Sequence, residues 1–192
     1  MSVATADPLH RVVLDAAIAI ARDEGPDAIS LRKVARDAGV SHQAPYHHFG
    51  DRAGIFAAIA EEGFSKLSEA LIASHNKGIS GMGEAYVRFA LKHAGHFRVM
   101  MRNDLCDLQN YPSALFQADR AFNLLLEAVT SALGNNATDD DIKTHTAFIW
   151  SVGHGLATLL LDGPLEIKLE GIADVNALIS HVARLATASM PQ

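Results

Sequence analysis

The sequence predicts an all-α fold of about nine helices, and three observations support this. Apolar residues recur at intervals of three and four in one segment after another, and no stretch alternates as a half-buried strand would. Residues that start helices precede these segments, and Gly, Asn or Pro follows them. With 49% hydrophobic and 20% charged residues, the 192-residue chain has the composition of a globular protein that can bury a substantial core.

Four helices are expected before residue 75. The first ends near Gly25-Pro26, the second at Gly39, the third is short, and the fourth follows one apolar stripe to about Ser74. Each begins at a side chain that can accept a hydrogen bond from a free N–H of the first turn. These capping residues are, in order, Asp7, Ser30, Ser41 and Asp51.

The segment 76–83 contains three glycines and is predicted to be a linker. Four main helical segments are expected after it, over about 84–102, 113–133, 139–161 and 175–186, with the acidic run 139–141 at the amino-terminal dipole of the third. We therefore expect a small domain over 1–52, continued through the helix 53–75, and a larger helical domain over 76–192.

Charge and cysteine content limit the possible classes of protein. The net charge of −6 argues mildly against a nucleic-acid ligand, but Ser30–Arg52 alone holds four basic and two acidic residues. Because salt screens each charge beyond about 8 Å, a local face can still bind DNA. One Cys excludes a disulfide framework, no export signal is visible, and the longest apolar tract, 147–161, is too short to span a bilayer. A cytoplasmic protein is expected.

The segment Ser30–Arg52 is the most informative stretch of the chain. It consists of two short predicted helices joined by a turn that contains Gly39, and aromatic, His and Gln side chains crowd the second helix. A helix-turn-helix presents the first turns of its second helix to base edges. Gln43 can pair with adenine and Ala44 can contact a thymine methyl. The spacing alone is a weak signal, because such helix pairs are common.

The longer segment LRKVARDAGVSHQAPYHHFGDRAGIFAAI, from Leu31, is similar to the DNA-binding module of the tetracycline-repressor family. The resemblance covers about Leu9 to Phe64. It includes the turn Gly39-Val40-Ser41, the aromatic pair Tyr46 and Phe49, and the basic residue Arg52. One departure is Pro45, where many relatives carry Leu. At about the fourth helical position Pro45 would remove one hydrogen bond and shift the start of the helix.

The resemblance implies which residues contact DNA. Base or groove contacts are expected from Arg32, His42, Gln43, Ala44 and Tyr46. Phosphate contacts are expected from side chains or first-turn amides at Ser30, Ser41, Tyr46, His47, His48 and Arg52.

In the second half of the chain, Trp150, His154 and Gly155 resemble the Trp-His-Gly signature of one class of carboxy-terminal domain in this family. That class implies a helical domain for ligand binding and dimerisation. The helix 147–161 is apolar on nearly every side, so its neighbours in a small domain would cover only part of it. We expect two copies of the chain to pair through this helix and the last one. A central core helix of a monomer is the alternative.

Met and aromatic residues on the helices after residue 76 are candidates to line a pocket for a largely apolar effector. The same spacing would equally make an ordinary core. The candidates are Tyr86, Phe89, His93, Phe97, Met100, Met101, Phe122, Leu126, Trp150 and His154.

No metal site or cofactor is expected. His47 and His48 are sequence neighbours that point to different faces of a helix, and no Cys or carboxylate at a matching spacing accompanies His93 and His96. No nucleophile motif or phosphate loop is present. The sequence predicts a ligand-responsive, homodimeric regulator, a repressor released from a palindromic operator by a small molecule. A small all-α enzyme and a protein-binding adaptor are the alternatives.

Overall fold

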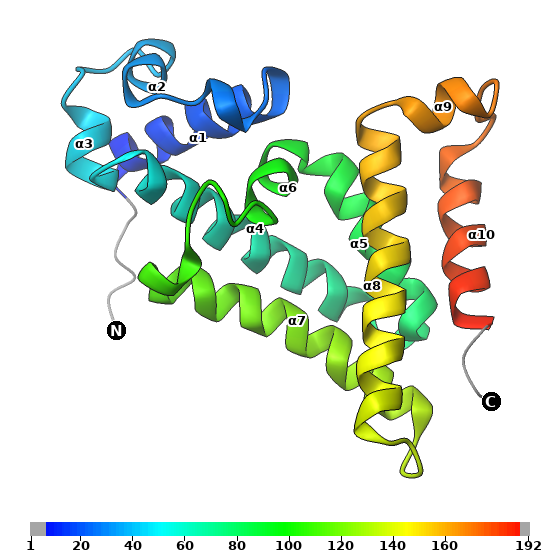
Figure 1. Cartoon of the computed structure of the whole chain (residues 1–192). Coiled ribbons are helices and arrows are strands. Elements are labelled where there is room, and N and C mark those ends of the chain that lie inside the picture. The colour runs from blue at the N-terminus through cyan, green and yellow to red at the C-terminus, as the bar shows by residue number, and fades with distance from the viewer. Residues whose placement is uncertain (1–6, 189–192) are drawn as a thin grey trace. The chain divides into compact units, whose positions relative to one another are not determined.

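A computed structural model describes residues 7–188, and this part of the chain is all-α, as predicted. It contains ten α-helices, one of them only five residues long, and three 3-10 helices (Figure 1). In chain order they are α1 (Pro8–Asp23), η1 (Pro26–Ala28), α2 (Leu31–Asp37), α3 (Ala44–Phe49), α4 (Arg52–Ser74), η2 (His75–Lys77), α5 (Gly78–Lys92), α6 (Ala94–Met100), η3 (Leu108–Asn110), α7 (Pro112–Leu133), α8 (Asp139–Leu161), α9 (Pro164–Lys168) and α10 (Val175–Ala188).

The chain divides into two compact units. The amino-terminal unit extends to Phe64 and includes His93–Ala118, whereas the carboxy-terminal unit comprises Ser65–Lys92 and the chain from Asp119 onward. The boundaries therefore fall within α4, between α5 and α6, and within α7. The compact units do not test the predicted functional division into a DNA-binding domain, 1–52, and an effector-binding domain, 76–192, which stays a prediction.

The amino-terminal unit has one apolar core, made mainly by α1, α2 and the first half of α4. Val13, Val34 and Ile55 are fully buried in it. α6 packs closely on α1, because a Cβ on Gly95 would lie 2.4 Å from the carbonyl oxygen of Ile18. This contact requires glycine at that position and sets how near the two helices lie.

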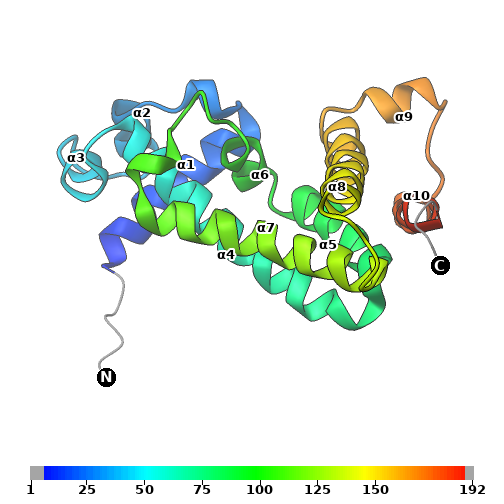
Figure 2. The same cartoon turned by 60° about the horizontal axis from the view of Figure 1, so that its bottom comes forward.

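The carboxy-terminal unit is built around α5, which packs against both α8 and α10. α9 and the turn after it join the end of α8 to the start of α10 (Figure 2). α8 begins with a capping box, in which the Thr138 hydroxyl accepts from the N–H of Asp141 and the Asp141 carboxylate accepts from the N–H of Thr138.

Two expectations about this part of the chain are wrong. The segment 76–83 is not a linker, because η2 and the first turns of α5 occupy it. Only Gly78 has the left-handed backbone of a turn (φ +66°), whereas Gly81 and Gly83 lie within α5. The helix expected to run through Met100 is also interrupted. It breaks at His93, whose backbone is not helical, so that α5 and α6 are separate helices.

Candidate nucleic-acid interface

α2 begins at the predicted capping residue. The Ser30 hydroxyl accepts a hydrogen bond from the N–H of Lys33 at 3.2 Å. The helix buries Leu31 and Val34 against the core and leaves Arg32 exposed. The capping that the sequence predicted at the start of α2 is therefore confirmed.

The turn between α2 and α3 depends on Gly39. Its φ of +68° is a left-handed conformation that favours glycine. The N–H of Gly39 bonds to the carbonyl oxygen of Arg36 at 3.1 Å, and that of Val40 to the carbonyl oxygen of Ala35 at 3.0 Å. These bonds end α2 and fix the direction in which the chain leaves it.

α3 begins two residues later than predicted. Gln43 is its N-cap residue, and no side chain caps the helix, so the predicted role of Ser41 as its cap is wrong. The carbonyl oxygen of Ser41 accepts from the N–H of Ala44 at 3.1 Å and shapes the turn instead. Pro45 is the second helical residue, where a missing N–H costs no intrahelical hydrogen bond. The expected loss of a bond at Pro45 is therefore absent.

The later start places His42 and Gln43 in the turn that precedes α3. Both are exposed, as are Ser41 and His47, and Tyr46 is 53% exposed. Ala44 differs, since it is only 6% exposed and packs into the unit. Ala44 therefore exposes little surface for its predicted contact with a thymine methyl. Ser41, His42 and Gln43 are thus exposed before the buried pair Ala44 and Pro45, and Tyr46 and His47 are exposed after it.

Ion pairs occupy most of the basic side chains near this stretch. The Lys33 ammonium lies 2.8 Å from Glu24 and 3.5 Å from Asp37, and Arg36 lies 3.0 Å from Asp37. Hydrogen bonding to Glu24 raises the pKa of Lys33. Arg32, in contrast, forms no ion pair with any residue from 7 to 188.

Arg52 and His48 each contact the protein. Arg52 donates to the carbonyl oxygens of Pro26 and Asp27, at 3.4 and 3.2 Å, and its guanidinium lies 5.0 Å from the centre of the Phe56 ring. The side chain of His48 is only 11% exposed and faces α1. These two residues are therefore less available to phosphates than His47 is.

A polar cluster around the buried His96 in the same unit was not predicted. Arg11 of α1 is hydrogen-bonded to Glu62 of α4 and to Asp15, and the other Glu62 oxygen lies 3.2 Å from Nε2 of His96. His96, on α6, is 5% exposed. The cluster connects three helices that are far apart in sequence, and no spacing within one helix could have revealed it.

The ten predicted effector-lining residues are divided between the two units. His93, Phe97, Met100 and Met101 belong to the amino-terminal unit, and the others to the carboxy-terminal unit. Phe97 and Met100 are buried, and so is Phe89. Packing of this kind is what the core alternative expects for these three residues.

Tyr86, Trp150 and His154 form the most ordered contact in the carboxy-terminal unit. The Tyr86 hydroxyl on α5 lies 3.0 Å from Nδ1 of His154 on α8 and also bonds with the Trp150 side chain. Burial raises the pKa of Tyr86 to about 12 and lowers that of His154, so both groups are neutral at pH 7. Phe122 of α7 lies against Trp150, with 5.9 Å between ring centres. Trp150 and His154 thus contact Tyr86 of α5 from one side of α8.

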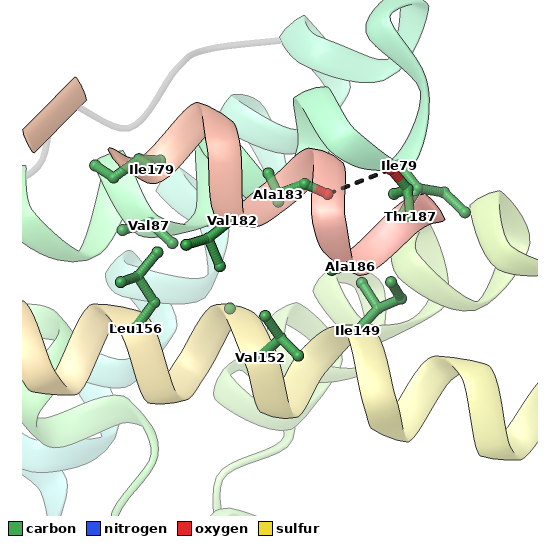
Figure 3. A pocket seen from close by; sticks show the side chains of 12 residues that line it. Ile79, Val87, Ile149, Val152, Leu156, Ile179, Val182, Ala183, Ala186 and Thr187 are labelled. Carbon is green, nitrogen blue, oxygen red and sulfur yellow. Dashed lines mark hydrogen bonds between the residues drawn. The ribbon is translucent and has the colours of Figure 1, made fainter. Parts of the chain in front are cut away.

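A small apolar hollow lies between α5, α8 and α10. Figure 3 shows its lining, which includes Val87, Val152 and Leu156, and the hydrogen bond from the Thr187 hydroxyl to the carbonyl oxygen of Ala183. The free space accommodates about one or two water molecules, too little for an organic effector. None of the predicted lining residues borders it.

Within residues 7–188, no group of three His, Cys, Asp or Glu side chains has a geometry that could hold a metal ion. No helix in the same range is long and apolar enough to cross a membrane.

Comparison with known families places these features in context. Residues 79–185 match the family model described as tetracyclin repressor-like, C-terminal domain, and residues 13–59 match that of bacterial regulatory proteins, tetR family. The chain belongs to the tetracycline-repressor family. The second match contains the whole of α2, the turn and α3, so this segment is a DNA-binding helix-turn-helix. The narrower assignment to the Trp-His-Gly class stays a prediction.

Individual relatives agree with the family assignment. The HTH-type transcriptional repressor AcnR of Corynebacterium efficiens is 32% identical over 96% of this chain and 98% of its own length. YobS of Bacillus subtilis, an uncharacterized HTH-type transcriptional regulator, is 30% identical over 97 residues, about half of each chain. The chain is thus a DNA-binding transcriptional regulator and not an enzyme.

Solved structures share the fold. A protein of unknown function from Rhodococcus sp. RHA1 superimposes with a TM-score of 0.76 at 27% identity, and the match covers all of both chains. The regulator PfmR of Thermus thermophilus gives a TM-score of 0.71 at 17% identity, with 94% of this chain and 99% of PfmR covered. These similarities confirm the predicted all-α fold with an amino-terminal helix-turn-helix.

Proposed function

We propose that the protein is a homodimeric repressor that reads a palindromic operator with two copies of α3 and releases it when a small, largely apolar molecule binds. The observation that carries this proposal is the set of exposed residues Ser41–Gln43, Tyr46 and His47 in a helix-turn-helix of a regulator family. Such a protein acts in the cytoplasm, where residues 1–52 bind DNA and residues 76–192 bind the effector and the second copy.

The exposed residues before α3 and those on α3 have different proposed roles. Gln43 and His42 precede the helix and are free to approach base edges, and Arg32 supplies a cation without an ion pair in the described chain. Tyr46 and His47 extend from the next turn toward the backbone phosphates. The first-turn amides at Ser30 add further phosphate contacts.

Pairing through α8 and α10 is supported by apolar side chains that these helices leave uncovered. Phe148 and Leu159 lie on one face of α8 and are 42% and 43% exposed, and Leu185 of α10 is 73% exposed. Exposed apolar side chains that share a face are typical of a binding surface. A Cβ on Gly155 would meet nothing within 4 Å, so a second helix can approach α8 closely there. Two recognition helices would then enter major grooves about 34–36 Å apart.

The Tyr86, Trp150 and His154 contact supports an effector site in the carboxy-terminal unit. Its polar groups are neutral and surrounded by aromatic rings, which suits an uncharged ligand with a hydrogen-bonding group. Binding can release DNA only to the extent that the ligand prefers the conformation that does not fit the operator.

The test uses the full chain and DNA from the region that flanks its own gene, with binding followed by fluorescence anisotropy. Tyr46→Ala should weaken binding to all sequences, whereas Gln43→Ala should chiefly relax base preference. Phe116→Ala is the matched control, because Phe116 is an exposed aromatic residue (65%) on α7. Equal losses on specific and random DNA for Gln43→Ala would contradict its base-reading role.

A further inference from the structure

Three histidines gather where the start of α1 meets the end of α3. The ring centre of His10 lies 4.5 Å from that of Phe49 and 5.9 Å from that of His48. His47 follows at 5.1 Å from His48. The rings of His10 and His48 meet edge to face, as do those of His47 and His48.

The charged groups around this cluster come from α1 and α4. Asp7, just before α1, lies 3.8 Å from Nε2 of His48, but its other oxygen caps α1 through the N–H of Leu9. Arg11 of α1 is already paired with Asp15 and Glu62. Burial, and then the neighbouring His48 and Arg11, lower the pKa of His10, while Asp7 and Glu61 act in the opposite direction. His10 is therefore neutral in the free protein at pH 7.

Two of the three histidines, His47 and His48, lie on α3 together with Tyr46. His47 is exposed next to Tyr46, and His10 is half-buried beside His48. His10 belongs to α1 and is outside the DNA contacts assigned above. A ligand that approaches from the solvent would first contact His47. The ring of His48 lies next to His47, and the ring of His10 lies next to His48.

We propose that a DNA phosphate binds at the exposed His47, and that the neighbouring rings of His47, His48 and His10 take up a proton when it binds. The proposal rests on the DNA-binding function proposed above and adds to it a pH-dependent affinity. An opposite charge within about 4–6 Å favours the protonated imidazole. Repulsion between two protonated rings at 5.9 Å opposes it, but a phosphate closer than that distance outweighs the repulsion.

The sign of the pH effect follows from this coupling. A histidine whose pKa is higher in the complex than in the free protein takes up a proton on binding. Affinity is then greatest below the pKa of the free protein and declines as pH rises through the pKa of the complex. One coupled proton changes affinity by up to about tenfold for each pH unit in that window.

The experiment measures affinity of the full chain for its operator DNA from pH 6.0 to 8.0 at constant ionic strength. We expect at least about a tenfold gain from pH 8 to pH 6 for the wild type. The triple variant His10→Gln, His47→Gln, His48→Gln should show a gain of less than about twofold.

One control locates the effect. His75→Gln changes an exposed histidine of η2 that has no assigned DNA contact. This variant should keep the full pH dependence. Calorimetric titration of the wild type in two buffers of different ionisation enthalpy measures proton uptake directly, without relying on a variant that folds.

Uptake of about one proton supports the proposal. Affinity that is flat or falls toward pH 6, absence of proton uptake, or a full pH dependence in the triple variant overturns it. Failure to bind DNA at any pH would instead contradict the proposed function.

Discussion

The two units differ in where they keep their large apolar side chains. In the amino-terminal unit, Ile55, Phe56 and Ile59 of α4 are nearly or fully buried beneath the DNA-binding helices. In the carboxy-terminal unit, aromatic and aliphatic residues of α8 and α10 remain exposed. The core around α4 in the first unit is thus covered within one chain, whereas α8 and α10 leave apolar side chains uncovered. The comparison supports the proposal that DNA binding and pairing use different units.

The largest effect is expected from a substitution in the core of the amino-terminal unit. Phe56→Ala should reduce the free energy of unfolding by about 3–5 kcal/mol, because the ring is 1% exposed and its removal leaves a cavity. Phe116→Ala, at a ring 65% exposed in the same unit, should change it by less than about 0.5 kcal/mol. Urea unfolding measures both. Similar losses for the two would mean that burial does not distinguish them.

The proposed pairing surface of α8 is tested by Gly155→Arg. Because nothing lies within 4 Å of a Cβ at this position, the folded chain should tolerate the change. A second helix packed there would meet a long charged side chain, so dimer affinity should fall by roughly a hundredfold, or about 2.7 kcal/mol. Sedimentation velocity gives the oligomeric state, with Asn136→Arg in the α7–α8 turn as the control. An unchanged dimer in Gly155→Arg would place the interface elsewhere.

The contact between Tyr86 of α5 and His154 of α8 is tested by His154→Phe. The Tyr86 hydroxyl would lose its partner at 3.0 Å, at a cost of about 1–3 kcal/mol. Adding Tyr86→Phe should recover part of this loss, since the hydroxyl that bonded with His154 is then absent. Thermal unfolding of the two single variants and the double variant gives the coupling, and strictly additive losses would contradict a direct contact.

The same histidine predicts a pH dependence of stability. Burial lowers the pKa of His154 in the folded chain, so the unfolded chain binds more protons below pH 6.5. Its contribution is complete above that value and is lost as pH falls toward the folded pKa. The melting temperature should decline less between pH 7.5 and 5.5 in His154→Phe than in the wild type. An identical decline would leave no role for this group.

The smallest effect compares two serines in the helix-turn-helix. Ser30→Ala removes the hydroxyl that caps α2 and should cost about 1 kcal/mol. Ser41→Ala should cost less than about 0.5 kcal/mol, because the Ser41 side chain caps no helix. Equal costs in urea unfolding would restore the capping role that the sequence predicted for Ser41.

Local signals explain why much of the fold was predictable. Asp7, Ser30 and Asp51 cap the helices that follow them, since capping depends on residues two or three positions apart. The start of α3 was missed because a backbone turn at Ser41 replaces the expected cap. Glycines near residue 80 favour a linker in sequence, but packing holds them in α5.

The candidate sites were less predictable wherever distant residues meet. The sequence singled out His154 but not Tyr86 as its partner, because 68 positions separate them. His10 carries no local signal that connects it with His48, 38 residues later. Side-chain exposure likewise separated Ala44 from its neighbours only in the folded chain.

The central claim is that two chains read one palindromic operator. Sedimentation velocity of the complex on an operator duplex, compared with a duplex that carries a single half-site, tests it most directly. Two chains on the full duplex and much weaker binding to the half-site are the predicted result. One chain per duplex, with equal affinity for both, would contradict the account.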